Sequence, residues 1–259
     1  MITPAPARIA FITLLAAPLA CAHKGDNVTV VHGDEPAANH SKDTAAQKPL
    51  PEVVVDPGQM FIDELETHLM RAKTVHIKAT LVATGAVNAA LVEEVSLGDG
   101  QKARMAVTGK FEGRDVDTWF VCDGKTMKVK GKDAAPADPE VRDAIVIGMV
   151  RMGLLHNAGL LVGGSAPEHS RGGLREFVKA ERPRAQTPAT DIKIDVVVHH
   201  DVMGEATLSL DETASLKKRH SELHFEEGDL VDDESYRVVL DGPIDDAVFA
   251  LAPASSPAP

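Results

Sequence analysis

The segment from Val116 to Gly131 constrains the fold more than any other stretch, because two alternating runs flank the dipeptide Asp123-Gly124. Asp-Gly between such runs is typical of a two-residue type I′ hairpin, in which both central residues need a positive φ. The register of this turn would give three cross-strand pairs: Cys122 with Lys125, Phe120 with Met127, and Asp117 with Lys130. One face would be apolar and the other would carry opposite charges, which predicts a hairpin with one buried face.

A loop around Gly85 to Asn88 and two further turns extend this hairpin into a five-strand antiparallel meander over residues 75–131. Gly98-Asp99-Gly100 is interpreted as a three-residue hairpin loop and Glu112-Gly113 as a two-residue turn. The expected pairs are Val95 with Ala103 across the first turn and Met105 with Phe120 across the second. All these turns keep the same apolar face through the five strands, and Glu93 is the one side chain that does not fit.

Helices are predicted before and after this meander. Asp56 as N-cap and Pro57 at the first helical position open an amphipathic helix that continues to Lys73. A second helical run covers residues 139–162 and contains several glycines. Polar residues such as Arg151 make a membrane span the weaker interpretation of this run. We therefore expect it to cover the apolar face of the sheet.

The second half of the chain returns to strand patterns. Four alternating runs, over residues 192–198, 202–210, 223–225 and 236–240, predict strands that continue the same sheet. Before these runs we expect a short helix over Leu174 to Ala180. An acidic loop over Glu226 to Glu234 would separate the last two runs, and a last turn with a short strand would follow them. The domain would span residues 56–253, with a disordered tail over residues 254–259. Its fold class is α+β, a curved antiparallel sheet with an N-terminal helix and inserted helices.

The first residues indicate a compartment. Residues 1–22 have the features of a secretory signal segment, and the run that ends at Cys21 resembles a bacterial lipobox, whose cysteine becomes the lipid-modified N-terminus. Ala20-Cys21-Ala22 also fits an ordinary cleavage site, which leaves a periplasmic or secreted protein as the alternative. Residues 23–55 are polar and aperiodic, so we expect a disordered tether. Because Ala22 is not Asp, the sorting rule of well-studied lipoproteins points to the outer membrane, facing the periplasm.

Composition and motifs argue against several function classes. The net charge of −12, without a Lys/Arg cluster, disfavours nucleic acid. Aromatic residues make up 3% of the chain, so a sugar-stacking or base-stacking site has little to stack on. The sequence contains no P-loop, no G-x-S-x-G and no dinucleotide fingerprint in its proper setting. We therefore expect a non-enzymatic binding protein without a cofactor or metal.

His220, Glu222 and His224 come nearest to a metal-binding pattern. On a strand they would point to one face, with Leu223 and Phe225 on the other. The simpler interpretation is a polar outer face. A metal-dependent hydrolase that uses His220 and His224 is kept as a weaker alternative.

The order of these elements is similar to that of the LolA/LolB superfamily, the lipoprotein-localisation factors and the LppX/LprG-type lipid-carrying lipoproteins. The similarity covers residues 57–253 and includes Thr74-Val75-His76, Phe120-Val121-Cys122-Asp123-Gly124 and the ending I-D-D-A-V-F-A-L-A-P. The Arg-Trp-Glu strand of LolA proper is absent. The resemblance implies an unclosed half-barrel whose concave face, covered by helices, holds acyl lipid or a lipidated protein. An envelope regulatory or structural protein that binds a protein partner is the alternative.

In such a half-barrel the apolar side chains between the sheet and the helices would line the ligand-binding cavity. The expected lining residues are Ile77, Leu81, Leu91, Val95, Met105, Val107, Phe120, Met127, Ile145, Met149 and Met152. The two methionines of the inserted helix suit an adaptable lid. We expect this lid to give way at Gly148 and Gly153, and we expect membrane contact through the N-terminal lipid anchor.

Overall fold

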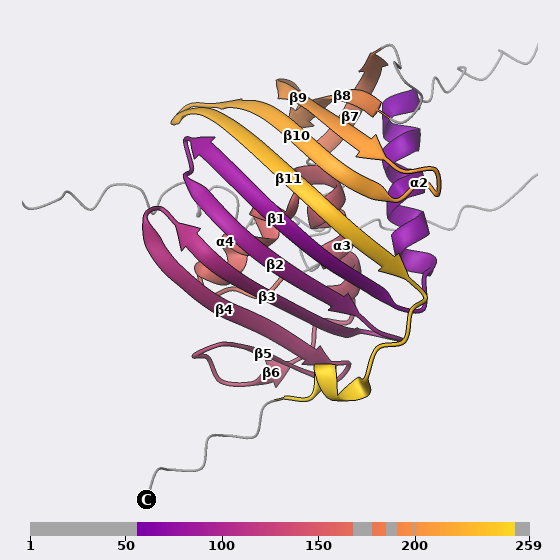
Figure 1. Cartoon of the computed structure of the whole chain (residues 1–259), viewed down its shortest axis with the longest axis vertical. Coiled ribbons are helices and arrows are strands. Elements are labelled where there is room, and N and C mark those ends of the chain that lie inside the picture. The colour runs from indigo at the N-terminus through magenta and orange to yellow at the C-terminus, as the bar shows by residue number, and fades with distance from the viewer. Residues whose placement is uncertain (1–55, 168–177, 185–190, 199, 252–259) are drawn as a thin grey trace, which may run out of the picture.

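A computed structural model describes residues 56–167, 178–184, 191–198 and 200–251. These residues form one antiparallel sheet of eleven strands in the order β6-β5-β4-β3-β2-β1-β11-β10-β9-β8-β7 (Figure 1). The strands are β1 (Val75–Gly85), β2 (Ala89–Leu97), β3 (Lys102–Phe111), β4 (Arg114–Asp123), β5 (Thr126–Val129), β6 (Ala135–Pro136), β7 (Val178–Arg184), β8 (Asp191–Val198), β9 (Asp201–Leu210), β10 (Leu216–Phe225) and β11 (Gly228–Leu240). The signal segment, the tether and the tail lie outside the described residues.

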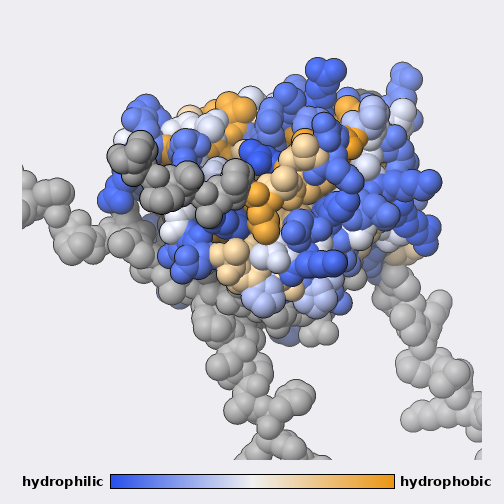
Figure 2. Space-filling view, turned by 90° about the horizontal axis from the view of Figure 1, so that it is seen from below, coloured by the Kyte–Doolittle hydropathy of each residue, from blue (hydrophilic) through white to orange (hydrophobic). Residues whose placement is uncertain are grey.

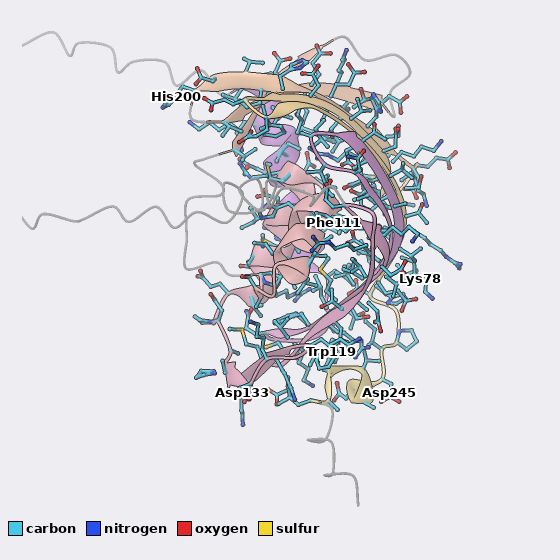
Figure 3. All side chains as sticks on the ribbon, turned by 90° about the vertical axis from the view of Figure 1, so that its left-hand side faces the viewer. Lys78, Phe111, Trp119, Asp133, His200 and Asp245 are labelled. Atoms are coloured by element: carbon cyan, nitrogen blue, oxygen red, sulfur yellow. The ribbon has the colours of Figure 1, made fainter. Side chains whose placement is uncertain are left out.

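The sheet is strongly curved and is not closed, and the helices lie in its concave side (Figure 3). They are α2 (Pro57–Arg71), α3 (Val141–Met152) and α4 (Leu154–Val162), with the short 3-10 helix η1 (Asp246–Phe249) at the chain end. This arrangement confirms the predicted α+β half-barrel. Within the described ranges no helix is long and apolar enough to cross a membrane.

Strand β1 joins the two halves of the sheet, because it pairs with β2 on one side and with β11 on the other. Its register with β11 runs from Val75 opposite Leu240 to Gly85 opposite Leu230. Every second residue of β1 from Val75 to Ala83 is buried, as alternation along a half-buried strand requires. The second meander therefore continues the first, as predicted.

The turn at Glu112-Gly113 has the predicted geometry. Both residues have a positive φ, of 50° and 74°, as a type I′ turn needs. Met105 lies opposite Phe120, and Lys110 forms an ion pair with Asp115 at 2.7 Å. The register of β3 against β4 is thus confirmed.

The predicted register at Asp123-Gly124 is wrong by two residues, since Cys122 lies opposite Met127 and Phe120 opposite Val129. The Asp123 carboxylate accepts hydrogen bonds from the backbone N–H groups of Lys125 and Thr126, each at 2.8 Å, and so stabilises a longer turn. A shift of two residues keeps each side chain on its predicted face. The buried face is therefore correct although the pairs are not, and Lys130 still forms its ion pair with Asp117 at 2.7 Å.

The loop after β2 differs from its prediction in the same way. Val95 lies opposite Met105 rather than Ala103, because the loop runs from Gly98 to Lys102 and closes with a backbone hydrogen bond of 2.8 Å between these two residues. Gly98 also lies against the ring of Phe249 from η1. The expected short strand near the C-terminus is wrong, because Asp245 caps a turn of 3-10 helix there and Phe249 is buried.

The first helix is placed as predicted. The Asp56 side chain accepts from the backbone N–H of Gly58 at 2.8 Å and caps α2. Ile62, Leu65 and Leu69 are buried on one face of α2, which packs against α3 and β7.

The second predicted helix is divided in two. Gly153 has a φ of 84° and separates α3 from α4. The N–H of Gly153 donates to the Met149 carbonyl at 3.0 Å, which closes the last turn of α3. Nearly every residue of the pair α3–α4 is buried, and we call this pair the lid.

Two predictions in the second half are wrong. Residues 178–180, expected in a helix, belong to β7, while residues 174–177 lie outside the described residues. The acidic segment 226–234, expected as a loop, is mostly the start of β11. Its residues alternate, with Leu230, Asp232 and Glu234 buried and the intervening residues exposed, so it has the period of a strand despite its charges.

Candidate functional site

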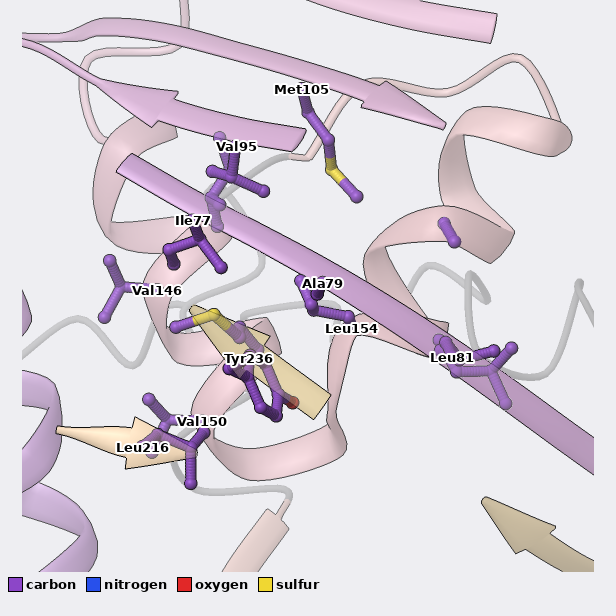
Figure 4. Packing of buried hydrophobic residues seen from close by; sticks show 14 of the residues in the cluster. Ile77, Ala79, Leu81, Val95, Met105, Val146, Val150, Leu154, Leu216 and Tyr236 are labelled. Carbon is purple, nitrogen blue, oxygen red and sulfur yellow. The ribbon is translucent and has the colours of Figure 1, made fainter. Parts of the chain in front are cut away.

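The residues expected to line a ligand come together in one core between the sheet and the lid. Ile77, Leu81, Leu91, Val95, Met105, Val107 and Phe120 project from β1 to β4 and are each at most 2% exposed. Ile145 and Met149 face them from α3, while Met127 and Met152 are partly buried at the margin. In Figure 4 the inward side chains of β1 lie against lid residues such as Val146 and Leu154. Lid side chains thus fill the concave face.

A small cavity of about 30 Å³ remains at one end of this core, which is room for one or two water molecules. Its walls are Val87, Phe111, Leu223, Phe225, Leu230 and Asp232 from the sheet side and Met152, Leu155, His156, Gly159 and Leu160 from the lid side. Of the expected lining residues only Met152 borders it. Pockets for small ligands usually measure about 300–1,000 Å³. An acyl chain therefore fits here only if the lid moves away from the sheet.

The sheet holds the lid at its break through Arg219 of β10, which is 1% exposed. Its guanidinium donates to the backbone carbonyls of Val150 at 2.8 Å and Arg151 at 3.0 Å, and to the hydroxyl of Ser221 at 2.9 Å. These carbonyls are at the C-terminus of α3, where a helix has unpaired acceptors and a partial negative charge. Arg219 thus caps α3 from the sheet.

Glu234 of β11 makes the complementary contact with α4. One carboxyl oxygen accepts from the backbone N–H of Leu155 at 3.1 Å, in the first turn of α4, and the other accepts from the hydroxyl of Tyr236. A Cβ at Gly153 would lie 2.7 Å from the Glu234 carboxyl, so the glycine permits this close approach. We call the contacts of Arg219 and Glu234 with the lid the latch.

The two helices of the lid are also connected to each other and to α2. The Asn157 side-chain amide donates to the Ile145 carbonyl at 3.0 Å and connects α4 with α3. Gly148 lies inside α3, where a Cβ would come within 2.5 Å of the Asn157 side chain, so it serves packing rather than bending. Arg151 is buried and donates to Glu66 and Asp63 of α2. Of the two expected hinge points, only Gly153 lies at a break.

Three carboxyl groups lie buried on the concave face near the latch. Burial raises the pKa of Glu93 and of Glu234 well above their ordinary values, and the charge of Asp232 adds to both effects. Burial also raises the pKa of Asp232 to about 6, although its hydrogen bond with Glu234 and the charge of Arg219 oppose the rise. Neither oxygen of Glu93 has a hydrogen-bond partner, and neither does Oδ1 of Asp232.

His156 of α4 faces the same region from the lid. It is 9% exposed, and burial lowers the pKa of its imidazole to about 4, so the ring is neutral at neutral pH. Its Nδ1 has no hydrogen-bond partner. Because His156 and Asp232 both border the cavity, the cavity has a polar end within apolar walls.

The histidine pattern of β10 lies on the opposite, convex face. His220 Nδ1 is 2.7 Å from Asp233, its Nε2 is 3.1 Å from Glu222, and His224 Nδ1 is 2.8 Å from Asp229. Neighbouring acids raise the pKa of His220. No group of three or more potential metal ligands occurs among the described residues. The geometry therefore gives the hydrolase hypothesis no support and agrees with a polar outer face.

The sequence interpretation missed the latch. The pattern identifies Glu93 as a misfit but not Arg219, Asp232 and Glu234. The predicted run over residues 223–225 covers only the end of β10 and leaves out Arg219, and the predicted acidic loop includes Asp232 and Glu234. Treating residues 228–240 as one alternating strand would place Asp232, Glu234 and Tyr236 on the inward face. That pattern is the signal that could have identified the latch.

No family model matches the sequence, and no curated protein matches it either. Similar solved structures include a LolA superfamily protein from Nitrosomonas europaea, which is 8% identical with a TM-score of 0.35 over 76% of this chain and 98% of that chain. A DUF1329 family protein from Desulfovibrio piger is 5% identical with a TM-score of 0.28, also over 76% of this chain and 98% of that chain.

Proposed function

We propose that this protein binds acyl chains of lipids or lipidated proteins between the sheet and the lid, as a non-enzymatic carrier or receptor of the cell envelope. The observation that supports this most is the lid itself. Two buried helices cover an apolar concave face, yet polar groups of the sheet hold them at their break, through Arg219 and Glu234.

Lid and ligand compete for the same surface in this proposal. Apolar burial contributes about 25 cal/mol per Å², or roughly 0.8 kcal/mol for each methylene of an acyl chain. A long chain can therefore replace the contacts of one or two helical turns. Gly153 is the point at which the lid bends, because its backbone already has a φ of 84° and interrupts the helix.

The N-terminal residues complete the proposal. Cys21 would carry a lipid anchor and residues 23–55 would tether the domain to the membrane. Substitution of Cys21 by serine should then release the folded protein from membranes into the soluble fraction. Unchanged membrane association would contradict the anchor.

Lipid extraction and mass spectrometry of protein purified from its native envelope test the binding proposal. We expect co-purifying acyl lipid in the folded protein. A bound polypeptide without an acyl chain would support the protein-partner alternative instead.

A substitution at the edge of the lid gives a second test. Met152→Ala removes a half-buried lid contact at the cavity, so the affinity for a pyrene-labelled long-chain alcohol should rise while the melting temperature changes little. The matched control is Met105→Ala, since Met105 is 0% exposed on the sheet and its loss should mainly reduce stability. A large fall in melting temperature with unchanged affinity in Met152→Ala would make the lid an ordinary part of the core.

A further inference from the structure

The polar end of the cavity contains buried polar atoms without hydrogen-bond partners. Asp232 is 2% exposed and borders the cavity, and its Oδ1 has no partner. His156 borders the cavity from the lid with an unpaired Nδ1. Buried polar atoms in proteins are normally hydrogen-bonded, so unpaired atoms at a cavity wall indicate where a group of a bound molecule can lie.

The nearby cation, Arg219, makes no hydrogen bond with either of these atoms. Arg219 already donates to two lid carbonyls and to Ser221. Its positive charge interacts with the carboxyl groups of Glu234 and Asp232. No hydrogen bond from Arg219 reaches Oδ1 of Asp232, which therefore stays without a donor.

We infer that this polar end binds the hydrogen-bond-donating headgroup of an amphiphile, with Asp232 and His156 as acceptors, and that an ammonium head binds better than a carboxylate head. This inference rests on the proposed function, because the alkyl tail needs the space that the lid vacates. A carboxylate or phosphate head would meet the negative charge of Asp232 and would supply no donor.

The size of the cavity agrees with this assignment. Its volume of about 30 Å³ accommodates a group as small as an ammonium or a hydroxyl, or one water molecule in its place. The apolar walls, including Phe111 and Leu155, would then surround the first carbons of the chain. A water molecule that stays in place whatever the headgroup is the competing explanation.

A headgroup series at constant chain length tests the inference. Dodecylammonium, dodecanol and dodecanoate would each displace a pyrene-labelled long-chain alcohol from the full-length protein below their critical micelle concentrations. We expect dodecylammonium to bind most tightly and dodecanoate most weakly, with at least about a tenfold difference between them. Equal affinities for the three heads would overturn the inference and leave the proposed function intact, whereas no displacement by any of them would contradict the proposed function.

A pair of neighbouring substitutions assigns the effect to the cavity. Asp232→Asn removes the charge inside, and Asp233→Asn removes the next charge along β11, which is exposed and lies beside His220. We expect Asp232→Asn to lose the preference for ammonium over carboxylate and Asp233→Asn to retain it. If both variants or neither lose the preference, the headgroup does not bind at Asp232. The wild-type series decides the inference by itself if Asp232→Asn does not fold.

Discussion

The convex and concave faces of this sheet both carry charged residues, but under very different conditions. On the convex face the charges form exposed pairs: Lys78 with Glu94 at 2.8 Å, Lys110 with Asp115 at 2.7 Å, and Lys130 with Asp117 at 2.7 Å. Such pairs contribute about 0–1 kcal/mol each, because water competes for both partners. On the concave face Arg219, Glu93, Asp232 and Glu234 are at most 2% exposed.

The charged residues of the two faces therefore have different roles. The convex pairs keep a large sheet surface hydrated, and seen from the end with β5 and β6 the surface is mostly hydrophilic around a narrow apolar band (Figure 2). The concave charges are desolvated, which costs several kcal/mol per ion unless good contacts offset it. The burial of Arg219 and Glu234 is offset by their hydrogen bonds with the lid at its break.

Removing the latch cation should have the largest effect on stability. Arg219→Met leaves the carbonyls of Val150 and Arg151 without their donor and removes the nearest cation from Glu234, so we expect a loss of about 3–5 kcal/mol. Urea unfolding measures it. The control Lys78→Met breaks an exposed pair and should lose less than about 1 kcal/mol. Similar losses in the two variants would show that the two faces do not differ as described.

Two glycines with positive φ provide the next comparison. Gly153→Ala should lower the free energy of unfolding by about 1–3 kcal/mol, because its Cβ would collide with the Glu234 carboxyl in addition to the backbone strain. Gly113 has a similar φ of 74°, and a Cβ there would have open space around it. Gly113→Ala should therefore show the backbone strain alone and lower the free energy of unfolding by about 1 kcal/mol. Equal losses in thermal unfolding would mean that Glu234 does not pack against the helix break.

A pH profile distinguishes the two faces on a single strand. The folded-state pKa of Glu93 is raised, so its contribution to stability is present below its ordinary pKa and is lost as pH rises through the raised value. Glu93→Gln should therefore gain stability relative to the wild type as pH increases. For Glu94, which Lys78 holds at a lowered pKa, the sign is opposite, so Glu94→Gln should lose a little stability above the ordinary pKa of Glu.

Urea unfolding between pH 4 and 8 tests both variants. The folded-state pKa of His156 is lowered, so His156 reduces stability as pH falls from 6.5 through about 4. This effect is the same in the wild type and in both variants. It therefore cancels when the stability of each variant is compared with that of the wild type. A pH profile of Glu93→Gln parallel to that of the wild type would contradict the buried position of Glu93.

The smallest effect is expected on the convex face. Asp117→Lys breaks the exposed pair with Lys130 and should change the free energy of unfolding by less than about 1 kcal/mol, with a smaller change at high salt. Phe120 in the same strand is 0% exposed, and Phe120→Asp should lose several kcal/mol because a charge enters the core. Comparable losses would refute the assignment of these faces.

The sequence predicts this sheet well because the alternation of side chains identifies the buried face of each strand even where the turn lengths are predicted wrongly. The pairings at Asp123-Gly124 and at Gly98 were wrong by two residues, yet Phe120 and Val95 are buried as expected. Turn lengths depend on details such as the hydrogen bonds to the Asp123 carboxylate, which a dipeptide pattern does not specify. The fold class therefore follows from periodicity, and the exact partners do not.

The latch is harder to predict, since its partners are far apart in the chain. Arg219 contacts carbonyls 68 and 69 residues away, and Glu234 contacts an amide 79 residues away. A charged residue on a strand is normally taken to face solvent, and the acids near residue 230 favoured a loop. Only the misplaced Glu93 indicated that the concave face contains polar groups.

The Leu155 amide provides the most direct test of a lid that a ligand displaces. Its N–H lies in the first turn of α4, where helix amides have no intrahelical acceptor, and it donates to Glu234 across the latch. If a bound chain displaces the lid, hydrogen exchange of this amide should accelerate when the protein is saturated with dodecylammonium, while exchange within β3 stays slow. Bound dodecylammonium with unchanged or slower exchange at Leu155 would contradict displacement of the lid.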